Sequence, residues 1–274
     1  MPLSINTNIA SLTAQRSFLN SNSALETAFE RLSTGKRINS ASDDAAGLAI
    51  ATELNSRVSG LNQAVRNVND GLSMVQIMEG TYDEVTTILQ RMRDMAVQAA
   101  NGSLSTAEKT YLETEETALV SALDAAIDQA TFNGTDLSTT GAGNTVVLLA
   151  GSNTGDQLTI SLSAANVSDA SALGVGSLNF ASAGASVIST IDTALTRVAT
   201  QRATLGAHQA QLESTVRNLS NVAENTAAAA GRIMDTDYAA ETANLTKAQI
   251  LQQAATSVLA QANAQPQAVL SLLQ

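Results

Sequence analysis

Apolar side chains recur every three or four residues along the first third of the chain. They form the series Leu54, Val58, Leu61, Val65, Val68, Leu72 and Val75, which resumes as Met78, Tyr82, Val85, Leu89, Met92, Ala96 and Ala99. This spacing places the apolar side chains on one face of an α-helix. The short step from Val75 to Met78, followed by Gly80, predicts a local register shift. We therefore expect a helix over 45–100, about 80 Å long and longer than a single compact globule needs.

The helical pattern stops at NGSLS (101–105) and restarts with Ser105 or Thr106 as the cap and Glu108 in the first turn. Residues 131–185 then differ in composition, because they hold eight of the 16 glycines and many Ser, Thr and Asn residues. Within them, TVVLLAG and DQLTISL are β-prone runs separated by SNTG, which predicts a β-hairpin. The rest of this middle region is predicted to be an exposed, variable loop.

A strict heptad returns in the last third of the chain. Every seventh residue is apolar in the series Ile191, Val198, Leu205, Leu212 and Leu219. The companion series is half polar, running Ile188, Leu195, Arg202, Gln209, Val216 and Ala223. One apolar and one mixed seam are typical of a helix packed on other helices. The predicted fold is therefore mainly α, a long antiparallel helical coiled-coil rod with a small β-hairpin region.

The two ends of the chain, 3–32 and 240–273, are amphipathic and are predicted to form paired helices. Their apolar positions include Leu25, Phe29, Leu32, Ile250, Leu251, Val258 and Leu259. Two helices of about 30 residues bury too little surface to offset their ordering entropy. We therefore expect the ends to be loosely ordered in the monomer and to fold by packing against other copies.

Composition and charge exclude several classes of function. The chain has no cysteine and 3% aromatic residues, which excludes disulfides and thiolate metal sites. Of the net charge of −11, residues 110–196 contribute nine acidic and no basic groups. No segment has the cationic excess that nucleic-acid binding needs. The first residues lack the pattern of a Sec signal peptide, and no apolar run approaches a membrane span. Neither nucleic acid nor membrane is an expected partner.

Isolated motifs give little support for catalysis, a cofactor or a metal. His208 is the only histidine, and with no second His or Cys it is interpreted as a partly exposed helix residue. The run ETEE (113–116) is interpreted as a solvated helix face, with partner contact as the alternative. FNGTDL (132–137) lacks the spacing of an EF-hand loop. No phosphate-binding glycine motif occurs, and the Ser/Thr-rich middle region leaves O-linked sugars as an open alternative.

The stretch STGKRINSASDDAAGLAIA (33–51) combines charges that resemble a site with the signals of a turn. Gly35 permits positive φ, Ser42 can cap a helix, and the following aspartates favour the positive end of that helix. General acid–base catalysis would need a cleft and a second polar group, which the neighbouring sequence does not supply. We interpret the stretch as a structural joint whose assembly residues are Lys36, Arg37, Asp43 and Asp44.

Several long motifs in order resemble bacterial flagellin in its short form, with core domains only. They are INTN (5–8), ERLSTGKRINSASDDAAGLAIA (30–51), GLNQAVRNVNDGLSMVQIMEG (60–80), LQRMRDMAVQAANG (89–102), FNG (132–134), LLAGSNTGDQLTISL (148–162) and RIMDTDYAAETANLTKAQILQQAATSVLAQANAQPQAVLSLL (232–273). Departures are small, such as Thr34 where the family often has Ser and Met95 where Leu is frequent. The resemblance covers nearly the whole chain.

The resemblance implies two domains and a set of partners. Residues 1–44 and 235–274 would form the inner, channel-lining domain, 45–234 the rod domain, and 33–46 the spoke between them. Export would use the flagellar type III apparatus and a dedicated chaperone, and polymerisation would occur beneath a cap protein. In flagellins sensed by the animal Toll-like receptor for flagellin, the contact motif is matched here by Gln90, Arg91, Met95 and Glu115.

The predicted function is therefore assembly into the extracellular flagellar filament, a homopolymer that serves motility, with no enzymatic activity. The heptad-patterned helices and amphipathic ends agree with this, because heterologous contacts repeat into an open helical polymer. Two alternatives stay open at this point. A hook–filament junction protein shares the terminal pattern, and a secreted helical translocator or adhesin would bind a membrane or a ligand without polymerising.

Overall fold

The structure is a computed structural model that describes residues 7–138, 144–164, 167–180 and 184–271. Residues 5–6 of the INTN motif and 272–273 of the C-terminal motif lie outside the described residues. The chain divides into two compact units. Unit 1 comprises Met1–Ser56 and Asn225–Gln274, and unit 2 comprises Arg57–Glu224.

Helices dominate the described residues, and the only strands form two small antiparallel pairs, β1 with β2 and β3 with β4. The elements are α1 (Ile9–Thr34), α2 (Ala45–Ala99), α3 (Thr106–Asp128), β1 (Thr131–Phe132), β2 (Thr135–Asp136), β3 (Asn144–Leu149), β4 (Gln157–Ser163), α4 (Ala170–Leu173), α5 (Gly184–Met234) and α6 (Tyr238–Ser271). The mainly α fold class and the predicted hairpin, β3–β4, are confirmed. The predicted domain boundaries at 44 and 235 coincide with the start of α2 and the end of α5, and as domain boundaries they stay a prediction.

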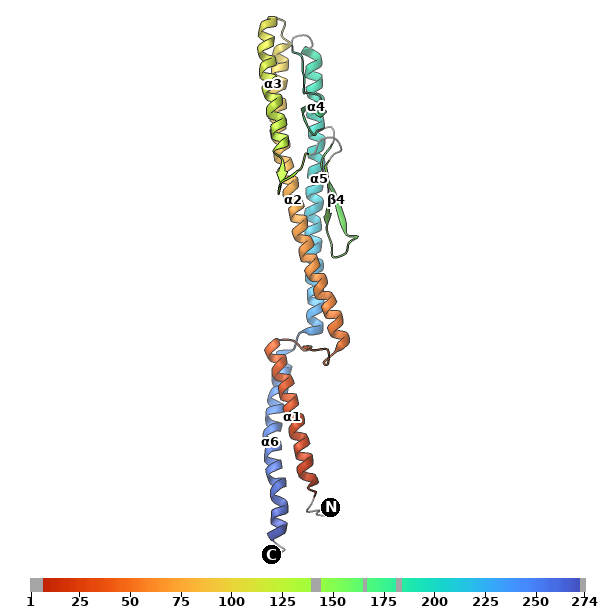
Figure 1. Cartoon of the computed structure of the whole chain (residues 1–274), viewed down its shortest axis with the longest axis vertical. Helices are drawn as coiled ribbons and strands as arrows, with labels where there is room; N and C mark the ends of the chain where they lie inside the picture. Colours follow the sequence, from red (N-terminus) through yellow and green to blue (C-terminus); the bar gives the residue numbers. More distant parts are fainter. Residues whose placement is uncertain (1–6, 139–143, 165–166, 181–183, 272–274) are drawn as a thin grey trace. The chain divides into compact units, whose positions relative to one another are not determined.

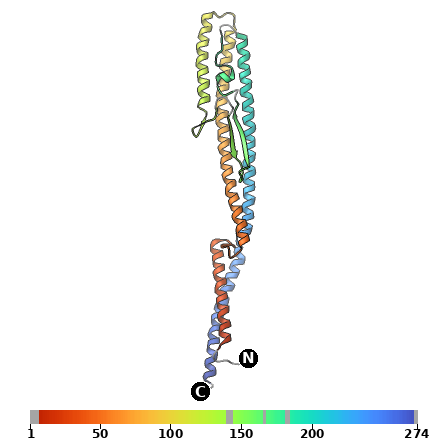
Figure 2. The same ribbon diagram turned by 45° about the vertical axis from the view of Figure 1, so that its right-hand side comes forward.

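In unit 2, α2, α3 and α5 lie side by side around one apolar core (Figures 1 and 2). The ion pairs Arg93–Asp192 and Arg202–Glu79 show that α2 and α5 are antiparallel, since the sequence number rises along one helix as it falls along the other. The apolar heptad predicted for α5 is buried throughout, and its companion series is half-buried apart from the buried Ala223. The two seams of α5 are therefore confirmed.

The predicted register shift in α2 is wrong. Steps of three and four residues continue without a break from Leu61 to Ala99, because Ala64 and Gly71 occupy the inner positions. Val65 and Leu72, which the apolar pattern favoured, are only half-buried. A Cβ at Gly71 would collide with the Leu148 side chain of the hairpin. Gly71 thus faces the core here because it makes room for β3.

The middle region contributes to the core of unit 2, and the prediction that its part outside the hairpin is an exposed loop is wrong for the residues around α4. Leu148, Ile160 and Leu162 of the hairpin are buried, as are Leu173 and Phe180 around α4. Polar contacts add to this packing. The Tyr82 hydroxyl lies 3.2 Å from the Ser163 hydroxyl, and the Gln201 amide donates to the Leu162 carbonyl (3.2 Å).

In unit 1, α1 and α6 form an antiparallel pair, side by side in Figures 1 and 2. Asn8 donates to the Ala262 carbonyl (2.7 Å), Gln252 donates to Asn22 (3.0 Å), and Arg31 lies 3.9 Å from Glu241. Alanine and serine occupy much of the seam between the two helices. Its buried residues are Ser11, Ala14 and Ala28 on α1 and, at heptad spacing, Glu241, Ala248, Ala255 and Ala262 on α6. The predicted pairing of the terminal helices is confirmed.

Candidate assembly site

The predicted joint is a turn of defined geometry that begins where α1 ends. Gly35 has φ of 70°, a left-handed conformation that favours glycine, and it closes the helix. A Cβ at this position would lie 2.8 Å from the Tyr238 hydroxyl oxygen. The local sequence therefore ends the helix and also leaves space for the first residue of α6.

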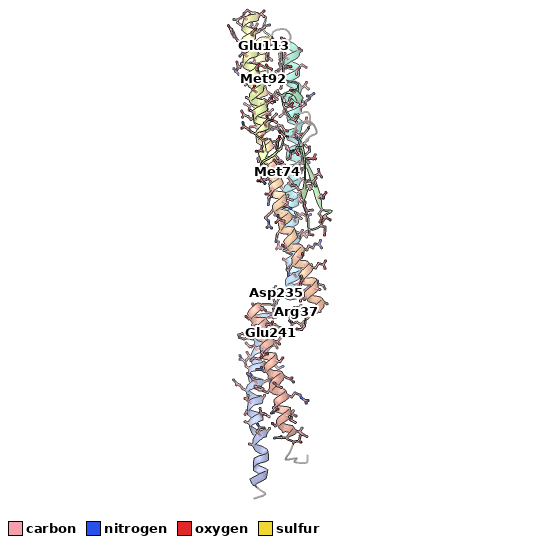
Figure 3. The ribbon with its side chains drawn as sticks, in the orientation of Figure 1. Arg37, Met74, Met92, Glu113, Asp235 and Glu241 are labelled. Atoms are coloured by element: carbon pink, nitrogen blue, oxygen red, sulfur yellow. The ribbon has the colours of Figure 1, made fainter. Side chains whose placement is uncertain are left out.

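After Gly35 the chain pairs with the segment that joins α5 to α6. The Arg37 N–H donates to the Met234 carbonyl (2.6 Å), and the Thr236 N–H donates to the Gly35 carbonyl (3.1 Å). The Arg37 guanidinium adds a bond to the Ile233 carbonyl (2.9 Å). Figure 3 labels Arg37, Asp235 and Glu241, which lie close together in this part of unit 1. The backbone of Lys36 and Arg37 thus connects the N-terminal and C-terminal parts of the chain.

The two predicted aspartates have different local roles. Asp43 accepts hydrogen bonds from the N–H groups of Asn39 (3.0 Å) and Ser40 (2.9 Å), and from the Ser40 hydroxyl (3.1 Å). The backbone donors of Ser40 and then Asn39 lower the pKa of Asp43, with Arg31 a smaller contributor. Asp43 therefore stays ionised, which does not suit a general acid at neutral pH.

Asp44 is the residue that caps α2. Its Oδ1 accepts from the Gly47 N–H (2.9 Å), the position that an N-cap side chain reaches. The prediction that Ser42 caps this helix is wrong, since the Ser42 hydroxyl pairs with that of Ser40 (2.7 Å). Gly47, in the first turn of α2, leaves space for this cap, because a side chain there would collide with the Asp44 carboxylate and with Ile38.

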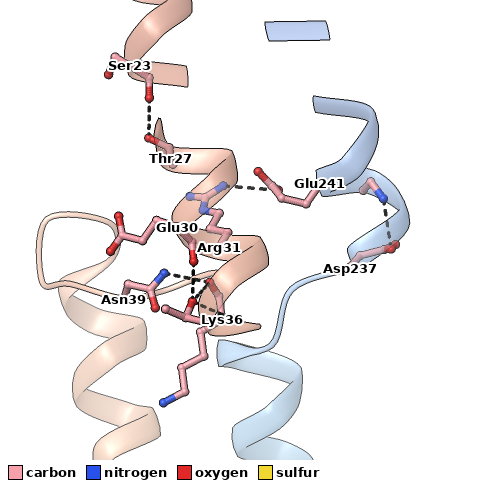
Figure 4. Close-up of polar contacts among 10 residues, drawn as sticks. Ser23, Thr27, Glu30, Arg31, Lys36, Asn39, Asp237 and Glu241 are labelled. Carbon is pink, nitrogen blue, oxygen red and sulfur yellow. Dashed lines mark hydrogen bonds and ion pairs between the residues drawn. The ribbon is translucent and has the colours of Figure 1, made fainter. Parts of the chain in front are cut away.

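Figure 4 shows the polar contacts around this turn, including the Arg31–Glu241 pair and the bond from the Asn39 amide to the Lys36 carbonyl (3.1 Å). The Lys36 amine points away from these contacts. A cavity of about 280 Å³ lies beside the turn, and its lining residues are Arg31, Arg37, Ile38, Asp43 and Asp44. All four predicted assembly residues, Lys36, Arg37, Asp43 and Asp44, belong to this one turn and have exposed side chains.

The residues matched to the receptor motif lie in unit 2. Arg91 of α2 donates to Glu115 of α3 through Nη2 (2.7 Å) and Nε (3.1 Å), and Gln90 beside it is exposed. Glu115 raises the pKa of Arg91 through these bonds. Met95 has 1% of its surface exposed, because it packs in the core. The structure brings Arg91 and Glu115 together and leaves Met95 without an accessible surface.

Of two other sequence interpretations, that of ETEE changes and that of His208 as a partly exposed helix residue is confirmed. The run ETEE is a solvated face only in part, because Glu116 is buried and accepts a bond from the Leu178 N–H (3.2 Å). His208 is half-buried, and its Nε2 accepts from the Ser161 N–H of β4 (3.2 Å). Among the described residues, no cluster of three or more His, Asp or Glu side chains is placed to hold a metal ion.

Sequence reasoning missed how the terminal helices divide their apolar residues. The seam uses alanines, so many of the larger apolar side chains of unit 1 face outward. They are Ile9, Leu12, Leu19, Phe29, Ile50, Tyr238, Ile250, Leu251 and Val258. The heptad of small residues at 248, 255 and 262 is the signal that could have revealed the seam. In the described part of the chain, no helix has an apolar stretch long enough to cross a bilayer.

Comparison with known proteins gives consistent matches along the chain. Residues 5–141 match the family model for the bacterial flagellin N-terminal helical region, and residues 188–273 match that for the C-terminal helical region. Flagellin from Halalkalibacterium halodurans is 41% identical over 272 residues, covering 98% of this chain and 99% of the relative. The flagellar filament 33 kDa core protein of Treponema phagedenis is 39% identical over 288 residues, covering 98% and 99%. The crystal structure of Bacillus cereus flagellin has a TM-score of 0.50 at 29% identity, over 60% of this chain and 94% of that one.

The paired terminal helices and the two matched regions define a helical protein of the bacterial flagellum. The chain belongs to the bacterial flagellin family. It is a structural subunit of the flagellar filament, which serves motility. The matches to these two relatives cover 98% of this chain and 99% of each relative.

Proposed function

We propose that the outward apolar faces of α1 and α6 are the main contacts through which this subunit polymerises. The observation that carries the proposal is the contrast between a seam of alanines and large exposed side chains. Phe29, for example, has 68% of its surface exposed. Contiguous exposed apolar surface is typical of protein interaction sites. Because different faces of the same unit are apolar, heterologous contacts can repeat into an open helical filament.

The same contrast supports the view that unit 1 becomes ordered on assembly. The alanine seam buries little apolar area per residue, and the exposed side chains gain burial only from other copies. Limited proteolysis tests this. Cleavage should remove parts of 1–44 and 235–274 from the monomer while 57–224 resists, and the filament should protect both ends. A monomer whose ends resist protease as well as unit 2 does would contradict the proposal.

In this proposal residues 33–46 are the spoke that joins the inner domain, 1–44 and 235–274, to the rod domain, 45–234. Lys36, Arg37, Asp43 and Asp44 are exposed and can contact neighbouring subunits. The double variant Asp43→Asn plus Asp44→Asn keeps acceptor oxygens for the turn and the cap but removes both charges. It should impair filament formation while the helicity of the monomer, measured by circular dichroism, changes little.

A control separates charge from capping at the joint. Asp44→Ala keeps Asp43 and removes the cap of α2, so it should lower monomer helicity, which the Asn variant does not. Electron microscopy of concentrated protein, with and without filament seeds, measures assembly. Normal filaments from the double Asn variant would show that the two charges make no subunit contact.

The proposal extends to the route to the filament. The chain would leave the cell through the flagellar type III apparatus without a cleaved Sec signal, held by an export chaperone, and would add beneath a cap protein onto a hook–filament junction. Its role would be structural, with no catalytic step. The large exposed side chains of α6, among them Ile250 and Leu251, support a chaperone contact. Binding of purified export chaperone to the monomer, but not to an Ile250→Ser, Leu251→Ser variant, would test this step.

Recognition by the animal Toll-like receptor for flagellin is proposed at Gln90, Arg91 and Glu115. Gln90 and Arg91 are consecutive exposed residues of α2, and Arg91 forms an ion pair with Glu115 of α3. Met95 would act only by packing beneath them, since it is buried. Arg91→Ala should reduce activation in a receptor reporter cell line, and Met95→Leu should leave it unchanged.

A further inference from the structure

A groove runs between α1 and α6 in unit 1. It has a volume of about 590 Å³, and its lining residues are Leu25, Glu26, Phe29, Glu30, Ser33, Thr34, Leu245 and Gln249. Its apolar side chains are Leu25, Phe29 and Leu245, and Glu26 and Glu30 line it one helical turn apart on α1. The groove thus offers an apolar surface beside two carboxylates.

The two carboxylates are available for a partner. Within the described residues, the salt bridges do not involve Glu26 or Glu30, and both side chains are exposed. Glu26 accepts a bond from the Asn22 amide (2.9 Å). A partner that fits the groove therefore carries apolar side chains together with a cation.

Such a face exists at the other end of α1. Leu12, Arg16 and Leu19 follow one another at i, i+4 and i+7, so they lie on one side of the helix. Leu12 is 54% exposed, Leu19 is 66% exposed, and Arg16 is also exposed. Arg16 takes part in no salt bridge among the described residues. This face is complementary to the groove in polarity and in charge.

The face and the groove of one copy cannot meet. Arg16 precedes Glu26 by ten residues on the same continuous helix, which separates them by about 15 Å along its axis. A contact between them therefore requires two copies. Since the face and the groove are different surfaces, the contact is heterologous and leaves a free face and a free groove at the ends of every series.

We propose that the groove binds the Leu12–Arg16–Leu19 face of a second copy, with the Arg16 guanidinium between Glu26 and Glu30. The inference rests on the proposed function, because it names one of the contacts through which the subunits polymerise. A planar guanidinium suits carboxylate pairing better than an ammonium does. This favours the α1 face over the exposed Lys247 and Leu251 of α6 as the occupant.

Charge reversal tests the pairing. Arg16→Glu would place an acid against the acidic groove, and Glu26→Arg plus Glu30→Arg would place basic groups against a basic face. Each variant should elongate filament seeds about tenfold more slowly than the wild type, since like charges oppose association at an interface. An equimolar mixture of the two variants should recover most of the rate, because each face then meets an opposite groove. The triple variant in one chain should recover likewise.

Two controls keep the result specific. Arg16→Glu combined in one chain with Glu84→Arg, a reversal of an exposed acid on α2, should show no recovery, because the groove stays acidic. Monomer helicity of each variant should match the wild type, since all the changed side chains are exposed. If the single reversals elongate normally, or if the mixture does not recover, the pairing is wrong while the proposed function stands. If wild-type protein fails to elongate seeds, the proposed function itself fails.

Cross-linking identifies the occupant directly, because the natural chain has no cysteine. A chain with Leu19→Cys and Phe29→Cys cannot close a disulfide within one copy, since the two positions lie about 15 Å apart on the helix. Oxidised filaments of this variant should give a ladder of covalent oligomers on a denaturing gel. A ladder from Leu251→Cys with Phe29→Cys, and none from the first pair, would assign the groove to α6 and overturn the proposal.

Discussion

The two units bury different kinds of residue. Unit 2 has a core of large side chains, with Tyr82, Phe180, Leu89 and Met92 among those fully buried. The seam between α1 and α6 in unit 1 buries mainly alanine, and its large apolar side chains face outward. Buried apolar area sets most of the stability of a packed helix. The difference predicts that unit 2 is stable by itself, and it is the basis of the proposal that the exposed apolar side chains of unit 1 are buried by other copies.

The largest expected effect is on the core of unit 2. Leu205→Ala removes a side chain with no exposed surface from the centre of the α5 heptad, so it should lower the free energy of unfolding by about 2–5 kcal/mol. Urea unfolding of the monomer, followed by circular dichroism, measures the loss. The matched change Leu19→Ala in unit 1 should leave the transition of the monomer unchanged. If Leu19→Ala destabilised the monomer equally, the contrast between the units would not hold.

A change in the seam of unit 1 should have a smaller and local effect. Ala255→Leu adds three carbon atoms where α1 and α6 approach closely, so overpacking should cost the pairing of the two helices about 1–3 kcal/mol. Hydrogen exchange read by mass spectrometry should show faster exchange in peptides of α1 and α6 and no change in unit 2. Gln253→Leu, at an exposed position two residues earlier, is the control. Equal effects from both substitutions would argue against a close-packed seam.

These results bear on what a sequence can predict. The sequence predicts the buried heptad from Ile191 to Leu219 correctly, because every position of the series carries a large apolar side chain. The face of α2 was predicted wrongly at Ala64 and Gly71, because small residues carry no hydrophobic signal. The side chain that requires a glycine at 71, Leu148, lies far along the chain. The alanine seam of α6 was missed for the same cause. Hydrophobic patterns in a sequence record the size and polarity of side chains. Whether a helix can approach another element closely depends also on the side chains of that element, which the pattern does not contain.

The turn that forms the candidate site could also be predicted only in part. Its four residues were placed in one turn by sequence, because helix-capping signals are local. Ser42 and Asp44 are both residues that can cap a helix, and only the geometry shows that Asp44 and not the predicted Ser42 caps α2. The burial of Glu116 could not be predicted either, since the segment that covers it, around Leu178, follows some 60 residues later.

The β3–β4 hairpin of unit 2 should be destabilised when its hydrogen bond to His208 of α5 is removed. His208→Ala removes the acceptor of the Ser161 N–H, which lies partly buried against α5. The unmet donor should cost about 1 kcal/mol, less than a core truncation does. Thr204→Ala, one turn earlier on the same helix, is the control. Faster exchange of the β4 amides in the His208 variant alone would confirm the attachment, and equal exchange in both would refute it.

The smallest effects concern two carboxylates whose pKa values shift in opposite directions. Burial raises the pKa of Glu116 above its ordinary value of 4.5, outweighing the bond from Leu178, and Glu113 adds to the rise. Backbone donors lower the pKa of Asp43 below its ordinary value of 3.8. The ionised form of Glu116 is therefore unfavourable to the fold, and that of Asp43 is favourable. The contributions of these two carboxylates to stability should consequently depend on pH with opposite signs.

For Glu116, the folded state gains stability below its ordinary pKa and loses it as the pH rises through the raised value. Glu116→Gln should thus be more stable than the wild type at pH 7, and the difference should vanish as the pH falls below the ordinary value of 4.5. For Asp43, the stabilising contribution of the ionised carboxylate is present above pH 3.8 and is lost as the pH falls through the lowered pKa. Asp43→Asn should therefore be less stable than the wild type at neutral pH and equally stable in acid. Urea unfolding between pH 3 and pH 8 measures the first variant, and hydrogen exchange of residues 36–47 over the same range measures the second. A Glu116→Gln protein less stable than the wild type at pH 7 would mean that the bond to Leu178 outweighs burial, and the contrast between the two carboxylates would then be lost.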